Sequence, residues 1–172
     1  TGSNYGLELT FERFFSRGYY YLITTSLYDS KYKGSDGVLR NTAFNGRFVF
    51  NVLAGKEFKI NDRSKLMIDL KVTNAGGKRY TPVNYEASSL EKKEVLFEDR
   101  AYSDKFDSYF RTDLKITYRL NSLRVAHEFF INIDNIFNTK NIFAQTYNIT
   151  DNRLNYIYQL GVFPTFQYKV YF

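Results

Sequence analysis

The sequence contains no cysteine, no tryptophan, only two prolines and a single histidine in 172 residues. The lack of cysteine excludes disulfide bonds, thiol catalysis and cysteine metal sites. The single histidine, His127, leaves one candidate for any histidine-based triad or dyad. No apolar run approaches the roughly 18 residues that a membrane-spanning helix needs, so a bundle of such helices is excluded.

Aromatic residues are abundant, at 19% of the chain, although the mean hydropathy is only −0.43. Alternating strands combine these properties, because every second residue is polar. The length suits one domain. The net charge of +6 comes from 24 basic and 18 acidic residues. They are dispersed along the chain, as in "EKKEVLFEDR", so no nucleic-acid partner is expected.

Seven segments alternate between apolar and polar residues, and each is predicted to be a β-strand. The predicted strands cover residues 5–12, 19–27, 44–52, 66–73, 110–120, 125–134 and 158–172. Within them, the apolar positions contain no Asp, Glu, Lys or Arg, and only His127 intrudes. Such a face fits either the lipid side of a barrel or the core of a water-soluble sandwich. Alternation alone therefore leaves both architectures open.

The connections favour the barrel. Short turns, such as "FSRG" and "LNSL", alternate with long connections, of which residues 76–107 are the longest. Outer-membrane barrels have short periplasmic turns and long extracellular loops. In that orientation the last strand runs downward, and Phe172 lies at the periplasmic rim. Because a complete barrel of this type has an even number of strands, the chain is expected to be the C-terminal part of a larger one.

Several stretches together resemble the C-terminal barrel portion of TonB-dependent outer-membrane receptors, in the form common in Bacteroidota. They are "GKEF", "GGKRYTPVNYEAS", "YFRTDLKITYRLN", "INIDNIFNTKNIF" and "YQLGVFPTFQYKVYF". The "NIDNIFN" stretch is similar to a motif that these receptors carry near their end. The terminal aromatic resembles the signal that the barrel-assembly machinery recognises.

The resemblance implies an all-β antiparallel meander within a 22-stranded transmembrane barrel, of which residues 1–172 form the C-terminal segment. It further implies that the whole protein imports a nutrient such as a siderophore, oligosaccharide or peptide, and is not an enzyme. The expected partners are outer-membrane lipid, the rest of the barrel with its plug, TonB, the assembly machinery and a surface lipoprotein. The plug and the TonB-contacting segment are not among these residues. The alternative is a small outer-membrane barrel with an enzymatic, structural or adhesive role and no TonB coupling.

No catalytic, cofactor-binding or metal-binding residues are predicted. Acidic residues on the polar parity are expected to form a salt network with Lys71, Arg111, Lys115 and Arg119, rather than to act as a catalytic pair. These acids are Asp69, Asp113, Glu128 and Asp134.

The remaining candidate functional residues are mostly aromatic. Tyr19, Tyr20 and Tyr21 are expected in the aromatic girdle at the periplasmic interface. Tyr80, Tyr85 and Tyr102 are the predicted ligand or partner contacts in the longest loop. The predicted lipid-facing assembly signal consists of Phe166, Tyr168, Val170 and Phe172.

Overall fold

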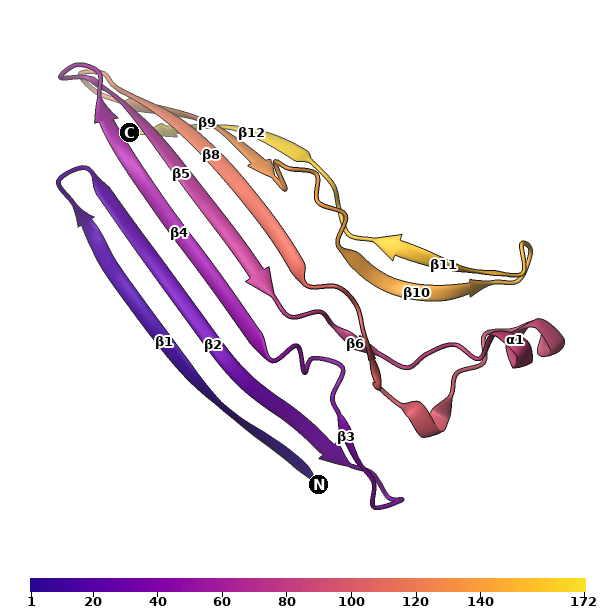
Figure 1. Cartoon of the computed structure of the whole chain (residues 1–172). Helices are drawn as coiled ribbons and strands as arrows, with labels where there is room; N and C mark the ends of the chain where they lie inside the picture. The colour runs from indigo at the N-terminus through magenta and orange to yellow at the C-terminus, as the bar shows by residue number, and fades with distance from the viewer.

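The computed structural model describes residues 1–172, and seven long strands form one continuous antiparallel sheet (Figure 1). Their order is β1-β2-β4-β5-β8-β9-β12, so each long strand lies beside the next one in the chain, and the predicted meander is confirmed. The long strands are β1 (Gly2–Ser16), β2 (Tyr19–Lys33), β4 (Phe48–Lys59), β5 (Ser64–Ala75), β8 (Tyr109–Asn121), β9 (Ala126–Asp134) and β12 (Phe163–Tyr171).

The remaining elements lie in the long connections between these strands. β3 (Leu39–Asn41) pairs with the last residues of β2. The other short strands form two separate pairs. The pairs are β6 (Arg79–Tyr80) with β7 (Asp104–Lys105), and β10 (Ile142–Asn148) with β11 (Arg153–Tyr158). The longest connection also holds the helix α1 (Tyr85–Glu91) and a 3-10 turn, Glu98–Arg100. No helix is long and apolar enough to cross a membrane.

All three tight turns lie at one end of the sheet, and the three long connections extend from the other end (Figure 1). In the first turn Arg17 and Gly18 both adopt positive φ, 55° and 79°, as a two-residue hairpin requires. In the second, the Asn61 side chain accepts the backbone N–H of Ser64 at 2.9 Å. The predicted alternation of short and long connections is therefore confirmed. We call these two ends the turn end and the loop end.

The third predicted strand is shifted along the sequence. Phe44 was expected within it, but β4 begins only at Phe48. Residues 44–47 instead cross the longest connection, where a Cβ on Gly46 would lie 2.6 Å from the carbonyl oxygen of Gly76. Such a close crossing leaves no room for a side chain at position 46, and the regular strand begins only beyond it. At its other end β4 continues through "GKEF" to Lys59, which shortens the following connection to a tight turn.

The last predicted strand is shorter than expected. Tyr158 ends β11, and β12 begins at Phe163. The backbone between them is held by side chains rather than by a strand: Asn135 donates to the carbonyl of Leu160 at 3.2 Å, and Asn138 accepts the N–H of Val162 at 3.3 Å. The predicted strand therefore divides into two, which belong to different sheets.

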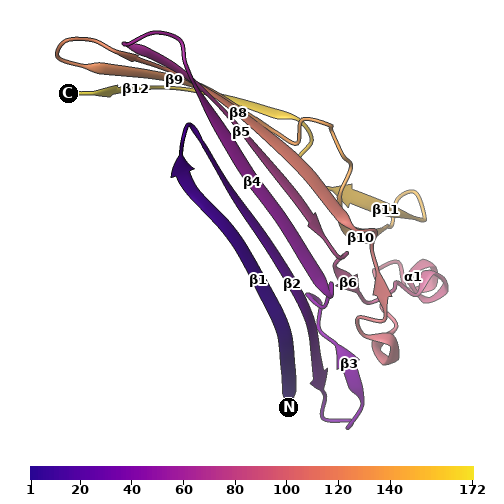
Figure 2. The ribbon, with the colours of Figure 1, turned by 60° about the vertical axis from the view of Figure 1, so that its left-hand side comes forward.

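The sheet is a single curved layer, and nothing in the chain packs over either face (Figure 2). Only 14 of 172 residues are buried, and the buried apolar side chains are Pro82, Val83, Phe106 and Tyr147. All four lie in the long connections. A water-soluble sandwich would bury one face of the sheet against a second sheet, and this arrangement is not present. The edge strands β1 and β12 each pair on one side only.

Candidate functional site

One face of the sheet is predominantly apolar. Residues directly opposite each other in neighbouring antiparallel strands point to the same side, so the strand register shows which side chains share this face. One row across the sheet contains Ala54, Leu70, Leu114, Ile133 and Pro164. The next row toward the turn end contains Ile68, Ile116, Ile131 and Phe166. We call this side of the sheet the apolar face.

The apolar face is exposed even at the centre of the sheet. Leu70 on β5 is 41% exposed, and Phe129 on β9 is 48% exposed. Exposed apolar patches larger than a few hundred Å² are rare on soluble monomers, and they mark surfaces that contact another molecule or a membrane. The apolar face spans all seven long strands, so it is a surface that requires an apolar neighbour.

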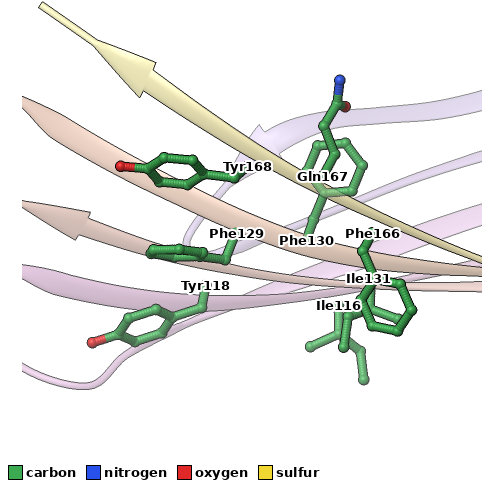
Figure 3. Close-up of a pocket in the computed structure, with 8 residues that line it drawn as sticks. All are labelled: Ile116, Tyr118, Phe129, Phe130, Ile131, Phe166, Gln167 and Tyr168. Carbon is green, nitrogen blue, oxygen red and sulfur yellow. The ribbon is translucent and has the colours of Figure 1, made fainter.

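Aromatic side chains form a row of the apolar face near the turn end on β8, β9 and β12 (Figure 3). Tyr118, Phe129 and Tyr168 stand side by side in this row, and the last two rings stack with centroids 4.7 Å apart. The Tyr168 hydroxyl lies 2.8 Å from Nδ1 of His127, one row further toward the turns. A shallow apolar hollow of about 500 Å³ separates this aromatic row from Ile116, Ile131 and Phe166.

The predicted assembly residues Phe166, Tyr168 and Val170 all lie on the apolar face of β12, in register with β9. Phe172 follows the end of β12 and is fully exposed. Their recognition by an assembly machinery stays a prediction. Of the predicted girdle residues, Tyr19 and Tyr21 share the apolar face, but Tyr20 points from the opposite one, because consecutive side chains alternate across a strand.

The opposite side of the sheet, which we call the polar face, holds a hydrogen-bond network. The Tyr20 hydroxyl donates to Oδ1 of Asp69 at 2.7 Å. Arg111 bridges two acids: its Nε lies 2.6 Å from Oδ1 of Asp113, and its Nη2 lies 2.7 Å from Oδ1 of Asp134. These groups line a polar hollow of about 360 Å³ at mid-sheet. A water-exposed surface accommodates such a network, and a hydrocarbon-exposed one does not.

The predicted salt network is only partly correct. Arg111 forms the predicted ion pairs, but Lys71 has no acid within ion-pair distance. Lys115 lies over the ring of Phe130, 4.4 Å from its centroid, and Arg119 lies 5.3 Å from that of Tyr171. Aromatic side chains on the polar face therefore take positions next to cations that acids were expected to occupy.

Charge is excluded from the centre of the apolar face but not from its ends. The strands are longer than predicted, so they also place Arg13 and Lys56 on this face near the turn end. Asp29 and Lys31 lie on it at the loop end, where they pair at 2.8 Å. On β1, β2 and β4, the charge-free part of the apolar face therefore lies between charged residues near its two ends.

Buried asparagines join the long connections to the loop end of the sheet. Asn45 is completely buried and donates to Asp29 and Asn41, both at 2.8 Å. Its carbonyl also accepts the Nε–H of Arg79, from the longest connection, at 3.2 Å. Asn141 bonds both the N–H and the carbonyl of Phe110 at 2.9 Å, so its amide replaces a neighbouring strand for β8. The connections are thus fixed relative to the sheet.

A pocket of about 320 Å³ lies among the long connections at the loop end. Its aromatic lining comes from Tyr28, Phe44, Tyr109 and Phe143, and its polar groups include Lys78, Asp107, Asn141 and Gln159. The Lys78 ammonium lies 5.3 Å from the centroid of the Phe143 ring. Aromatic surfaces beside a few convergent polar groups are typical of small-molecule sites. This pocket could not be predicted from local sequence, because its lining combines residues of three separate connections with Tyr28 of β2 and Tyr109 of β8.

The three predicted loop tyrosines each pack against a different aromatic ring. Tyr80 stacks on Phe106 at 4.1 Å, Tyr85 meets Tyr147 edge-on at 6.2 Å, and Tyr102 meets Tyr32 edge-on at 6.2 Å. None of the three tyrosines lines the loop-end pocket. Burial raises the pKa of the Tyr80 phenol, and the negative charge of Asp104 adds to this effect. Tyr80 therefore stays protonated at neutral pH. A ligand-binding role for these tyrosines stays a prediction.

Comparison with known proteins adds no relative: no family model, no curated protein and no solved structure matches the chain. Nor does any group of three or more His, Asp or Glu side chains come together in a way that could hold a metal ion. What the site can do follows from its geometry, which consists of an apolar face, a polar face and a pocket at the loop end.

Proposed function

We propose that the chain forms part of the wall of an outer-membrane β-barrel, with the apolar face toward lipid and the polar face toward a wet interior. The observation that carries this proposal is the uncovered apolar face, which extends across seven strands opposite a hydrogen-bonded polar face. In lipid every backbone polar group needs an internal partner. The free edges of β1 and β12 are therefore expected to pair with further strands of the same barrel.

The long strands have the length that this role requires. A tilted spanning strand needs about 9–11 residues, and the seven long strands contain between 9 and 15. The turn end would then face the periplasm and the loop end the outside, in the usual arrangement of bacterial barrels. The loop-end pocket would open toward the external medium.

We further propose that the whole protein is a TonB-dependent receptor that imports a nutrient such as a siderophore, oligosaccharide or peptide. The support for this step is the resemblance of the "GGKRYTPVNYEAS" and "INIDNIFNTKNIF" stretches to that family. In the structure these two stretches contribute Gly76, Gly77, Lys78, Asn141 and Phe143 to the loop-end pocket. The import role therefore places substrate contacts in the same pocket.

Cysteine labelling tests which side of the sheet faces lipid and which faces water. The chain has no native cysteine, and Leu70 and Lys71 are adjacent residues on opposite faces of β5. In the intact protein, in outer-membrane vesicles, Lys71→Cys is expected to react with a water-soluble maleimide through the barrel interior. Leu70→Cys is expected to react only after the membrane is dissolved in detergent. Equal labelling of both variants before detergent is added would show that neither side of β5 faces lipid.

Growth on the nutrient as sole source tests the import role. Cells that depend on the intact protein for a siderophore-bound metal, an oligosaccharide or a peptide are expected to stop growing when TonB is disrupted. Unchanged uptake without TonB would instead favour the small barrel with an enzymatic, structural or adhesive role. The labelling result does not depend on this outcome, so the two proposals can fail separately.

A further inference from the structure

Two cations near the turn end of the apolar face have no acidic partner. Arg13 lies on β1 opposite Tyr21, and Lys56 lies on β4 opposite Tyr19. Neither lies within 4.0 Å of a carboxylate oxygen, whereas the neighbouring Lys59 and Lys65 both form ion pairs. The nearby carboxylate of Glu57 is on the polar face and accepts from Lys65. The two unpaired charges therefore lie on the side of the sheet proposed to contact lipid, on strands that flank β2.

Aromatic rings hold the two cations in place. The Arg13 guanidinium lies 4.1 Å from the centroid of the Tyr19 ring, and the Lys56 ammonium lies 5.1 Å from that of Phe58. Because Tyr19 is directly opposite Lys56, one ring stands between the two charges. Stacking occupies a face of the guanidinium and leaves its edges free of any acidic partner. The Nε of Arg13 is buried and has no hydrogen-bond partner, so the terminal nitrogens are the ones offered to a ligand.

The depth of the pair matches a lipid headgroup. Arg13 and Lys56 each lie three positions before the last residue of their strands, Ser16 and Lys59. β1 has 15 residues, several more than the roughly 9–11 that cross the hydrocarbon. Long basic side chains near the end of a membrane segment extend toward the interface and place their charge at headgroup level. The pair is thus close enough to the hydrocarbon to contact lipid and shallow enough to stay charged.

We propose that Arg13, Tyr19 and Lys56 form a binding site for the phosphate of a glycerophospholipid in the periplasmic leaflet. The guanidinium and the ammonium supply charge-assisted hydrogen bonds to the phosphate oxygens. The acyl chains lie along the apolar side chains of β2 and β4 above it, such as Ile23 and Val52, which are paired on the same face. The site rests on the proposed membrane orientation. It adds one specific phospholipid contact to the non-specific contact between the apolar face and lipid.

Native mass spectrometry of the intact, delipidated protein in detergent tests the site, with dioleoylphosphatidylglycerol as the probe. The double variant Arg13→Gln with Lys56→Gln is expected to hold one phospholipid fewer than the wild type. Loss of two charge-assisted contacts should weaken that last lipid at least about tenfold. The matched control is Lys59→Gln with Lys65→Gln, which removes two charges at the same end of the sheet but on the polar face. It is expected to behave as the wild type does.

Two further ligands separate the possible sources of binding. Dioleoylglycerol, which lacks the phosphate, is expected to bind wild type and double variant equally. Lipid A, the phosphorylated lipid of the outer leaflet, is expected to gain nothing from Arg13 and Lys56. A preference for lipid A that depends on these residues would overturn the assignment to the periplasmic leaflet. Equal retention of phosphatidylglycerol by wild type and double variant would overturn the site itself.

Membrane insertion is measured in the same preparations. If the double variant fails to insert, the single variant Lys56→Gln replaces it, with an expected intermediate loss of binding. A wild type that inserts, and whose phospholipid binding is insensitive to both variants, refutes the site and leaves the barrel proposal intact. A wild type that fails to insert at all refutes the barrel proposal, and the site with it.

Discussion

Replacing Phe166 by lysine is the sharpest test of which side of the sheet faces lipid. Phe166 is 72% exposed and lies in the row of Ile116 and Ile131 on the apolar face. A phenylalanine side chain offers about 150–250 Å², so about 110–180 Å² would be in contact with lipid. At about 25 cal/mol per Å², losing this contact costs about 3–4.5 kcal/mol. A lysine on the lipid side adds between about 0 kcal/mol near the interface and about 4 kcal/mol at mid-depth.

The sum, about 3–8 kcal/mol, is a large part of the total stability of many folded domains. Phe166→Lys is therefore expected to prevent assembly of the intact protein. Thr165→Lys is the matched control, because Thr165 is the adjacent residue on the polar face, opposite Asn132 and near the acid Asp134. It is expected to assemble like the wild type. Gln167 is a poorer control, since Lys115 and Lys169 both already lie near the ring of its partner Phe130.

The assay needs only the yield in the outer-membrane fraction and the heat-modifiable mobility of the folded protein on a gel. The expected pattern is loss of the folded band for Phe166→Lys and its retention for Thr165→Lys. If both variants assembled equally well, or both failed equally, the assignment of the two faces would be wrong. The cysteine-labelling result on β5 would then have to fail as well, because the same strand register defines both experiments.

Two further predictions concern the loop end. Asn135→Ala removes a buried amide that bonds Thr139 twice and Leu160 once, so it is expected to destabilise the third long connection by about 2–4 kcal/mol. Faster proteolysis of that connection would reveal this, and Asn155→Ala, a residue without side-chain hydrogen bonds, would show no change. Gly76→Ala is expected to lower the folded yield sharply, because its Cβ would lie 1.7 Å from the carbonyl oxygen of Gly46. Gly2→Ala, whose nearest contact is at 3.7 Å, should fold normally, and equal yields of the two variants would contradict the proposed crossing.

The alternating pattern was sufficient to predict the long strands and their faces. Apart from Val125, which lies in the turn before β9, each apolar position predicted on β5, β8 and β9 lies on the apolar face. A strand has only two sides, and a shift by one residue would reverse them. The tight turns were also predictable, since "SRG" places glycine where the hairpin needs positive φ. Strand ends were predicted less well. Pairing extends β4 to Lys59 through residues that do not alternate clearly.

The loop end could not be predicted, because it depends on contacts between segments far apart in the sequence. Gly46 and Gly76 are ordinary loop glycines until the two connections cross, and Lys78 meets Phe143 from another connection. The helix α1 is an exception. Asn84 caps it by accepting the N–H of Ala87 at 3.1 Å, and Glu86 follows in the first turn. Such a pattern is a recognised start signal for a helix, so α1 could have been found from the sequence.

The location of the buried apolar side chains has a consequence for how such a protein can change. Val83, Phe106 and Tyr147 form small separate cores within the long connections, whereas the sheet has no core of its own. A substitution on a face of the sheet therefore changes contacts with the surroundings of the sheet, whereas a substitution in a small core changes contacts with a few neighbouring residues. If the proposed barrel is correct, the composition of the sheet is constrained by lipid and water, and that of the connections is constrained by local packing.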